Sequence, residues 1–176
     1  KTCVIGVEDN KPEAIAALNQ AVSGMKNVSV LAMKALYPKG AEKVIIYEAT
    51  GRVVEEGKLP ADAGVIAMNV ATISKLADFL KTGMPLVEKM LTVDGGSVAE
   101  PKNIIAPIGT PIKDMVEFCG GYKSEPKKLI LGGPMMGICV FSDEFPLLKN
   151  NNAILAFDES QCAPVKETAC IRCGRC

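Results

Sequence analysis

The stretch that decides the fold is TCVIGVEDNKPEAIAALNQAVSGMKNVSVLAM, residues 2–33. Its opening residues 2–7 form a short apolar run bounded by charged residues, which is typical of a buried strand. Residues 28–33 form a second apolar run of the same kind. A helical pattern separates the two runs, and a strand, a helix and a strand at this spacing indicate a βαβ unit. The sequence therefore predicts a parallel α/β sheet.

The helix between these strands carries its own start and stop signals. Asn10 followed by Glu13 suggests a capping box, and Pro12 suits the first turn, where its missing N–H is not needed. Gly24 marks the end. The apolar positions that share one face are Ile15, Leu18, Val22 and Met25.

The next residues continue the alternation of helices and strands. A helix is expected over residues 41–49, ending at Gly51, although the β-branched run in it also allows a strand. Residues 65–67 are expected to form a short strand. Asn69 then caps a helix that ends at Gly83.

The pattern changes near residue 85. Two strand-like pieces joined by a Gly-Gly turn, a short helix opened by Pro111, and two further strands predict a small α+β module of the β-grasp type. We therefore expect three parts: an α/β domain over residues 1–85, a β-grasp domain over 86–145, and a polar connector with a cysteine motif over 146–176. The last part contains one apolar run, AILAF, which we interpret as belonging to the connector.

The composition narrows the classes of function. The 20 Lys and Arg balance the 20 Asp and Glu, so the chain lacks the basic surface that nucleic-acid binding requires. No apolar run approaches the roughly 20 residues of a membrane-spanning helix, and we expect no direct membrane insertion. The sequence contains no His, which excludes imidazole-based triads and metal sites within it. Metal or redox chemistry therefore depends on its 7 cysteines.

Three of these cysteines end the sequence as Cys170-Ile-Arg-Cys173-Gly-Arg-Cys176. This spacing suits a cubane iron–sulfur cluster, because a tight loop can place successive sulfurs at adjacent iron corners. The ferredoxin pattern is C-x2-C-x2-C-x3-C-P, whose fourth cysteine commonly ligates a second cluster. Since the sequence stops at the third cysteine, we expect a piece of a longer protein. An odd cysteine count without a secretory signal favours a reduced compartment over a disulfide framework.

Zinc binding and thiol redox chemistry are the alternatives for these cysteines. A structural zinc site usually takes four ligands, as two spaced pairs or with His, and the single run here fits that poorly. A redox-active C-x-x-C is expected in a βαβ context, whereas this one follows a polar connector. Cys3, Cys119 and Cys139 are expected in the core as small hydrophobes. Cys162, in the connector, stays open as a redox-linked residue or a stray ligand.

A family resemblance rests on motifs that occur in a fixed order. They are YPKGAEK (37–43), TGR (50–52), LPADAGVIAMNVAT (59–72), LTVDGG (91–96), APIGTPI (106–112), GGPMMG (132–137) and the cysteine run. In this order they resemble RnfC, the peripheral electron-input subunit of the ion-translocating ferredoxin:NAD oxidoreductase (Rnf) complex. RnfC is in turn similar to the flavin-bearing, NADH-oxidising subunit of respiratory complex I.

The resemblance implies the fold class, the cofactors and the partners. It implies a complex-I-flavoprotein-like α/β domain, a β-grasp (SLBB) domain and the start of a ferredoxin-type segment. The cofactors implied for the intact protein are FMN, NAD(H) and two 4Fe–4S clusters. The implied partners are the other Rnf subunits, NADH and, indirectly, ferredoxin. The implied location is cytoplasmic, on the inner face of the cell membrane, where the complex holds the protein.

The same resemblance implies site residues. The complex I relative has a G-E-E segment beside its flavin, and here it resembles Gly40-Ala41-Glu42, so Gly40 and Glu42 are retained as candidates. The relative's N-N-V-E-T resembles residues 68–72, in which only Asn69 and Thr72 remain polar. An Asn before a helix can present its amide beside free backbone N–H groups, which suits a phosphate. Plain helix capping is the alternative for Asn69. Cys170, Cys173 and Cys176 are the implied cluster ligands.

Several expectations stay open at this stage. The family's Gly-rich flavin loop lies before residue 1, so we expect these residues alone to bind little FMN and not to oxidise NADH. The segment 132–137 predicts a tight turn, with its two Met filling a gap between packed elements rather than touching a ligand. The rival functions are a soluble RnfC-like carrier that feeds a cobalamin or amino-acid reductase, and a non-redox β-grasp module that binds a ligand or a partner.

Overall fold

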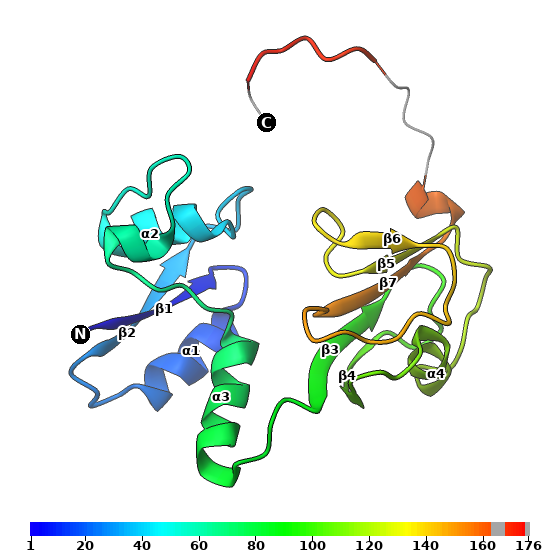
Figure 1. Ribbon diagram of the computed structural model, residues 1–176, viewed down its shortest axis with the longest axis horizontal. Helices are drawn as coiled ribbons and strands as arrows, with labels where there is room; N and C mark the ends of the chain where they lie inside the picture. Colours follow the sequence, from blue (N-terminus) through cyan, green and yellow to red (C-terminus); the bar gives the residue numbers. More distant parts are fainter. Residues whose placement is uncertain (163–167, 175–176) are drawn as a thin grey trace. The chain divides into compact units, whose positions relative to one another are not determined.

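The computed structural model of the protein describes residues 1–162 and 168–174. The chain forms two compact units, Lys1–Val70 and Ala71–Cys176, which are coloured along the sequence in Figure 1. Within the described residues the first unit has a sheet of two strands and the second has a sheet of five.

The first unit begins with a strand, a helix and a parallel strand. β1 (Cys3–Glu8) and β2 (Val28–Met33) pair in parallel over their whole lengths. α1 (Pro12–Ala21) connects them, and with α2 (Glu42–Thr50) it flanks the two strands (Figure 1). The βαβ unit expected from the opening sequence is confirmed, and so is the helical interpretation of the segment that contains α2.

The start of α1 differs from the expected capping box. Lys11, not Asn10, immediately precedes the helix, and no side-chain cap is formed. The Lys11 N–H donates to the Glu8 carbonyl at 3.1 Å, and this turn moves the helix start one residue along the chain. The Asn10 side chain accepts a bond from the Lys11 ammonium at 3.0 Å instead. The predicted capping box with Glu13 is therefore wrong, whereas Pro12 lies in the first turn as expected.

The link between α2 and α3 contains a short helix where a strand was expected beyond it. η1 (Pro60–Ala63) is a turn of 3₁₀ helix that the sequence analysis did not predict. Residues 65–67 form no strand, because the described part of the first unit pairs only β1 with β2 and offers this segment no ladder partner. α3 (Val70–Thr82) then follows, and Gly83 takes a positive φ of 72° at its end, as its position predicted.

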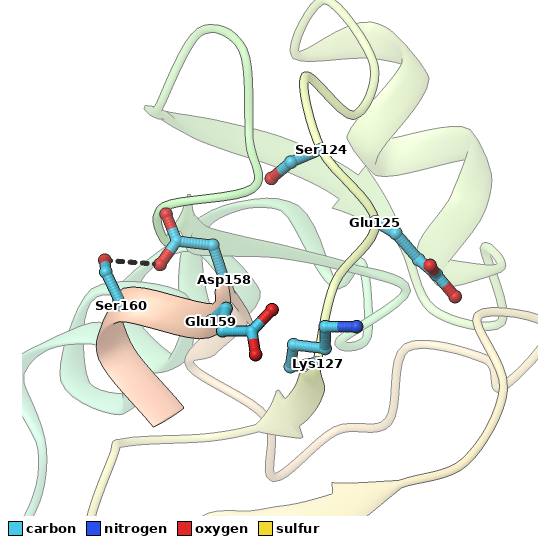
Figure 2. A pocket seen from close by; sticks show the side chains of 6 residues that line it. All are labelled: Ser124, Glu125, Lys127, Asp158, Glu159 and Ser160. Atoms are coloured by element: carbon cyan, nitrogen blue, oxygen red, sulfur yellow. Dashed lines mark hydrogen bonds between the residues drawn. The ribbon is translucent and has the colours of Figure 1, made fainter. Parts of the chain in front are cut away.

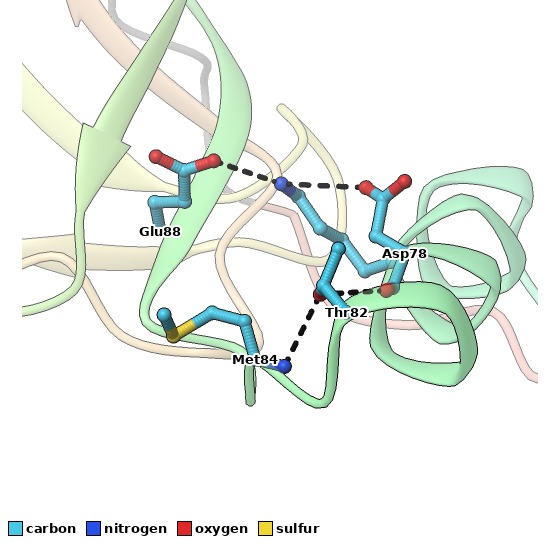
Figure 3. A network of polar contacts seen from close by, with 5 residues as sticks. Asp78, Thr82, Met84 and Glu88 are labelled. Carbon is cyan, nitrogen blue, oxygen red and sulfur yellow. Dashed lines mark hydrogen bonds and ion pairs between the residues drawn. The ribbon is translucent and has the colours of Figure 1, made fainter.

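Polar contacts connect the end of α3 to the first strand of the second sheet. Figure 3 shows the Lys75 ammonium between the Glu88 carboxylate, at 3.0 Å, and the Asp78 carboxylate, at 3.8 Å. The Thr82 hydroxyl donates to the Asp78 carbonyl at 2.8 Å and accepts the Met84 N–H at 3.2 Å. These contacts fix the turn by which the helix leads into the β-grasp domain.

The second unit is a mixed sheet with one short helix against it. Its elements are β3 (Glu88–Asp94), β4 (Lys102–Pro107), α4 (Ile112–Phe118), β5 (Lys128–Leu131), β6 (Ile138–Val140), β7 (Ala153–Phe157) and η2 (Glu159–Cys162). The strand order is β4-β3-β7-β5-β6, and β7 runs parallel to β3 and antiparallel to β5. The expected two strands, helix and two strands are confirmed.

The strand β7 corrects the sequence interpretation. Its residues, AILAF, were assigned to the connector, yet β7 occupies the middle of the five-stranded sheet. Ile154 and Ala156 on this strand are fully buried. The buried cluster of this unit consists of Leu91, Val93, Val98, Ile104, Ala106, Ile112, Met115, Val116, Cys119, Leu129, Leu131, Leu147, Ile154 and Ala156.

Three expectations about sulfur-containing side chains are wrong. Cys119 is buried as predicted, but Cys3 and Cys139 are exposed. Cys3 begins a two-stranded sheet, and Cys139 lies on β6, an edge strand of the second sheet, so neither strand is enclosed on both faces. Met135 and Met136 are 64% and 84% exposed, and they fill no gap in this structure. The turn itself is tight, since the Gly137 N–H donates to the Gly133 carbonyl at 2.8 Å. Across the described residues, no helix is long and apolar enough to cross a membrane.

Candidate functional site

Gly40 lies in a tight loop just before α2. In this loop the Lys39 N–H donates to the Leu36 carbonyl at 2.7 Å, and the Ala41 N–H donates to the Pro38 carbonyl at 2.8 Å. A Cβ placed on Gly40 would meet no atom within 4 Å, and its φ is not positive. Neither packing nor backbone conformation therefore requires glycine here, which leaves the close approach of another molecule as a physical reason for it.

Charged side chains hold the start of α2 in place. The Lys39 ammonium lies 2.7 Å from the Glu48 carboxylate, and the Lys43 ammonium donates to the Glu55 carbonyl at 2.8 Å. Glu42 is the first residue of α2 and is exposed. A carboxylate there is favourable beside the positive end of the helix dipole, and it disfavours a second anion at the same place. Glu42 is therefore suited to accept hydrogen bonds from hydroxyl groups rather than to face a phosphate.

The start of α3 has the opposite electrostatic character. Asn69 immediately precedes this helix and Thr72 is its third residue, and both are exposed. The first turn of α3 contains no acidic residue. The positive end of its dipole is thus not neutralised by a carboxylate of its own first turn, which suits an anion such as a phosphate. Asn69 and Thr72 add an amide and a hydroxyl at this helix start.

Arg52 is a residue whose role the sequence analysis did not identify. Its guanidinium donates from Nη1 to the carbonyls of Ala63, at 2.9 Å, and Gly64, at 3.0 Å. Gly51 just before it takes a left-handed φ of 69° and ends α2. Arg52 thereby ties the end of α2 to the segment that leads to Asn69. The TGR motif was the signal for it, since a glycine stop followed by an arginine places a long donor at the end of a helix.

The cysteine segment is exposed in its described part. Cys170 and Cys173 are exposed, and residues 168–174 contain no helix or strand. The Arg172 N–H lies 3.4 Å from the Cys170 sulfur, with Arg172 at a φ of 54°. Backbone N–H groups directed at cysteine sulfur are among the interactions that set iron–sulfur potentials, so this loop fits a cluster ligand. Cys176 lies outside the described residues, and among those described no group of three ligands for a metal forms.

A shallow hollow of about 420 Å³ lies at the base of η2 in the second unit. Figure 2 shows its lining residues, which are Ser124, Glu125, Lys127, Asp158, Glu159 and Ser160. Carboxylates outnumber the one ammonium group, and no large apolar side chain is among them. Cofactor pockets are mostly apolar with a few placed polar groups, so this hollow does not have the character of a flavin or nicotinamide pocket.

Comparison with known proteins divides the chain in the same order as the motifs. Residues 1–78 match the family of the Nuo51 FMN-binding domain, and residues 90–138 match the SLBB domain family. Together with the mixed helices and sheets, these matches confirm the expected fold class.

Relatives match the chain over nearly its whole length. It is 46% identical over 98% of its length to the RnfC protein of the proton-translocating ferredoxin:NAD(+) oxidoreductase complex of Clostridium ljungdahlii, covering 37% of that protein. It is 42% identical over 98% of its length to the RnfC protein of the Na(+)-translocating complex of Acetobacterium woodii, covering 39%. The corresponding protein of the ion-translocating oxidoreductase complex of Pseudomonas aeruginosa is 39% identical over 98% of the chain and covered to 22%. The chain thus spans about a fifth to two fifths of these relatives.

Proposed function

Because this chain is homologous to RnfC, a component of ion-translocating ferredoxin:NAD oxidoreductase complexes, we propose that it is part of an electron-transfer subunit. In this proposal electrons pass between NAD(H), FMN and 4Fe–4S clusters in a membrane-associated Rnf complex. The observation that carries the proposal is a match to an FMN-binding domain and a closely spaced cysteine series in one chain. The partners are the other Rnf subunits and NADH, with ferredoxin reached indirectly. The protein lies on the cytoplasmic face of the cell membrane, held there by the complex.

The three-part division of the chain belongs to this proposal. The α/β part over residues 1–85 contributes to the flavin and nicotinamide site, and the cysteine part over 146–176 begins the cluster segment. The expected middle part, 86–145, gains β7 (Ala153–Phe157), because that strand lies in the centre of its sheet.

On the flavin side, two helix starts divide the work. Bound FMN would accept a hydride from NADH and release its electrons singly to the clusters. Asn69 and Thr72 hold the phosphate at the start of α3, whose first turn carries no carboxylate to oppose it. Glu42 accepts hydrogen bonds from hydroxyls, and Gly40 leaves its side of the loop unobstructed.

On the cluster side, thiolates supply the ligands. Cys170, Cys173 and Cys176 bind iron of one cluster, and the ferredoxin pattern assigns the fourth ligand to a cysteine beyond this series. The Arg172 N–H, 3.4 Å from the Cys170 sulfur, stabilises that sulfur in its thiolate form.

The test uses the complete gene product, purified without oxygen. We expect flavin absorption, acid-labile sulfide and the EPR signals of two reduced cubane clusters. Replacing Cys173→Ser should remove about half of the iron, because its series serves one of the two clusters. Cys139→Ser is the matched control, since this exposed cysteine lies on β6 outside the series, and it should keep all of the iron.

A second variant separates the two cofactors. Asn69→Ala should lower the FMN content and leave the iron content unchanged, because Asn69 acts at the start of α3 only. A colourless protein that contains zinc in place of iron would overturn the electron-transfer proposal and favour a non-redox β-grasp module.

A further inference from the structure

Two turns at one end of the β-grasp sheet are joined to each other. The first, 94–97, follows β3, and the second, 158–162, follows β7 and contains η2. The Gly96 N–H donates to the Gln161 side-chain oxygen at 2.6 Å, and the Ser97 N–H donates to the Ala156 carbonyl at 3.0 Å. One side-chain amide therefore closes a contact between segments 65 residues apart.

The glycines of the first turn are required by this contact. A Cβ on Gly96 would lie 2.1 Å from the Asp158 carboxylate and 2.6 Å from the Gln161 side-chain oxygen. A Cβ on Gly95 would lie 2.2 Å from the Ala156 carbonyl oxygen, and Gly95 also has a φ of 121°. Contacts this short do not occur for real Cβ atoms, so the LTVDGG motif is fitted to the turn after β7.

Asp158 organises the second turn from within. Its carboxylate accepts the Ser160 hydroxyl at 2.6 Å (Figure 2) and the Gln161 N–H at 3.2 Å. The Ser160 hydroxyl bond, followed by backbone N–H groups and the charge of Lys123, lowers the pKa of Asp158 from its usual value. The ionised carboxylate thus shapes η2 so that Gln161 faces the Gly96 N–H.

We propose that these two turns form a clasp, residues 94–97 with residues 158–162, that fixes the point where the cysteine segment leaves the β-grasp domain. The proposal rests on the proposed function, because the segment matters as the first part of a cluster site. Gly96 and Gln161 are its positioning residues.

The reach of the chain shows what the clasp restricts. Cys170 follows Cys162 by 8 residues (170 − 162), so with the clasp closed it lies at most roughly 26–29 Å from Cys162. If the clasp opens, the last fixed residue is Phe157 at the end of β7, and the separation rises to 13 residues (170 − 157), or at most roughly 43–47 Å. An open clasp therefore enlarges the volume in which the cluster ligands can lie, and it lengthens the path that electrons must cross.

The first experiment measures hydrogen exchange of the peptide backbone in the complete gene product. Gly96→Ala and Gln161→Ala should speed exchange of residues 158–162 at least about tenfold, because each removes the contact that protects this turn. Gly133→Ala is the matched control, since a Cβ at Gly133 would meet nothing within 4 Å, and its exchange should match the unchanged protein. Gln161→Ala guards against a folding failure of the glycine variant. Equal exchange in all four proteins would overturn the clasp.

The second experiment measures how fast the clusters are reduced after NADH is mixed with the protein, followed by freeze-quench EPR. In Gln161→Ala this reduction should be several-fold slower while the iron content and the melting temperature stay unchanged. An unchanged rate in a variant with fast exchange would overturn the positioning role. A protein without clusters would refute the proposed function instead, and the exchange result would still decide whether the clasp exists.

Discussion

The two units of this chain differ in how completely they bury their side chains. Among the described residues of the first unit only Met33, Ile46 and Val54 are buried hydrophobics, whereas the second unit has one continuous buried cluster that both faces of β7 help to form. The first unit nevertheless carries the residues that resemble a flavin site. The second unit carries motifs of the same glycine-rich appearance and is packed like an ordinary domain core.

The difference teaches that glycine motifs have two physical meanings in one chain. In the β-grasp domain a Cβ on Gly95 or Gly96 would collide with neighbouring atoms, so these glycines are explained by packing alone. Gly40 in the first unit has open space around it and no positive φ. Its explanation must lie in something that approaches the loop from outside, which is the reason to connect it with a bound cofactor. The predictions below test this contrast.

The largest effect is expected for Gly95→Ala. The new Cβ would lie 2.2 Å from a carbonyl oxygen of β7 and would force a residue with a side chain into a φ of 121°. Overpacking and backbone strain each cost about 1–3 kcal/mol, so the β-grasp domain should lose about 3 kcal/mol or more of its free energy of unfolding. Urea unfolding followed by circular dichroism measures the change. Gly133→Ala in the same domain is the control, and a Gly95→Ala protein as stable as this control would remove the packing explanation.

Ile154→Ala should have the next largest effect. Ile154 is fully buried at the centre of the sheet, and removing its side chain should cost about 2–5 kcal/mol of unfolding free energy. Ile66, 81% exposed in the first unit, is the control, and Ile66→Ala should change stability by less than about 0.5 kcal/mol. The measurement is again the denaturation midpoint. Equal losses in both variants would contradict the claim that only the second unit has a continuous core.

The sequence predicted local structure better than it predicted sheet membership. The strand, helix and strand of residues 2–33 were found because apolar spacing and stop residues act within a short stretch. β7 was missed because its five residues gain their meaning from pairing with β3 and β5, the first of which lies about 60 residues earlier. Periodicity does not reveal a partner so far away. For the same reason it could not show that Cys139 lies on an edge strand and is exposed.

The candidate site was accessible from the sequence in a different way. Gly40, Glu42, Asn69 and Thr72 came from the resemblance, and they stay predictions that the proposed experiments test. The structure adds the contrast between the two helix starts, one beginning with a carboxylate and the other without one. The contacts of Arg52 with the carbonyls before Asn69 could not be predicted, because they depend on how the loop over residues 53–64 folds back.

A smaller effect is expected from Tyr122 at alkaline pH. Burial, and then the charge of Asp143 3.4 Å away, raises the pKa of Tyr122 to about 12. The folded β-grasp domain therefore favours the neutral phenol, and this contribution is complete below pH 10 and lost as the pH rises from about 10 to about 12. Tyr122→Phe should lose less stability than the unchanged protein over this range, as measured by urea midpoints at each pH. Parallel curves for the two proteins would show that Tyr122 does not titrate as a buried group.

The smallest effect on stability is expected at Gly40, and it is the sharpest test of the contrast. Since a Cβ there would meet nothing within 4 Å, Gly40→Ala should change the unfolding free energy by less than about 0.5 kcal/mol. If the glycine serves a cofactor, the same substitution in the complete gene product should weaken FMN binding about tenfold, because the added methyl occupies space that the flavin approaches. Fluorescence titration of FMN and thermal melting, performed on the same preparation, separate the two quantities. A variant with unchanged FMN affinity would give Gly40 no cofactor role, and a variant that melts earlier would make this glycine structural, like those of the β-grasp domain.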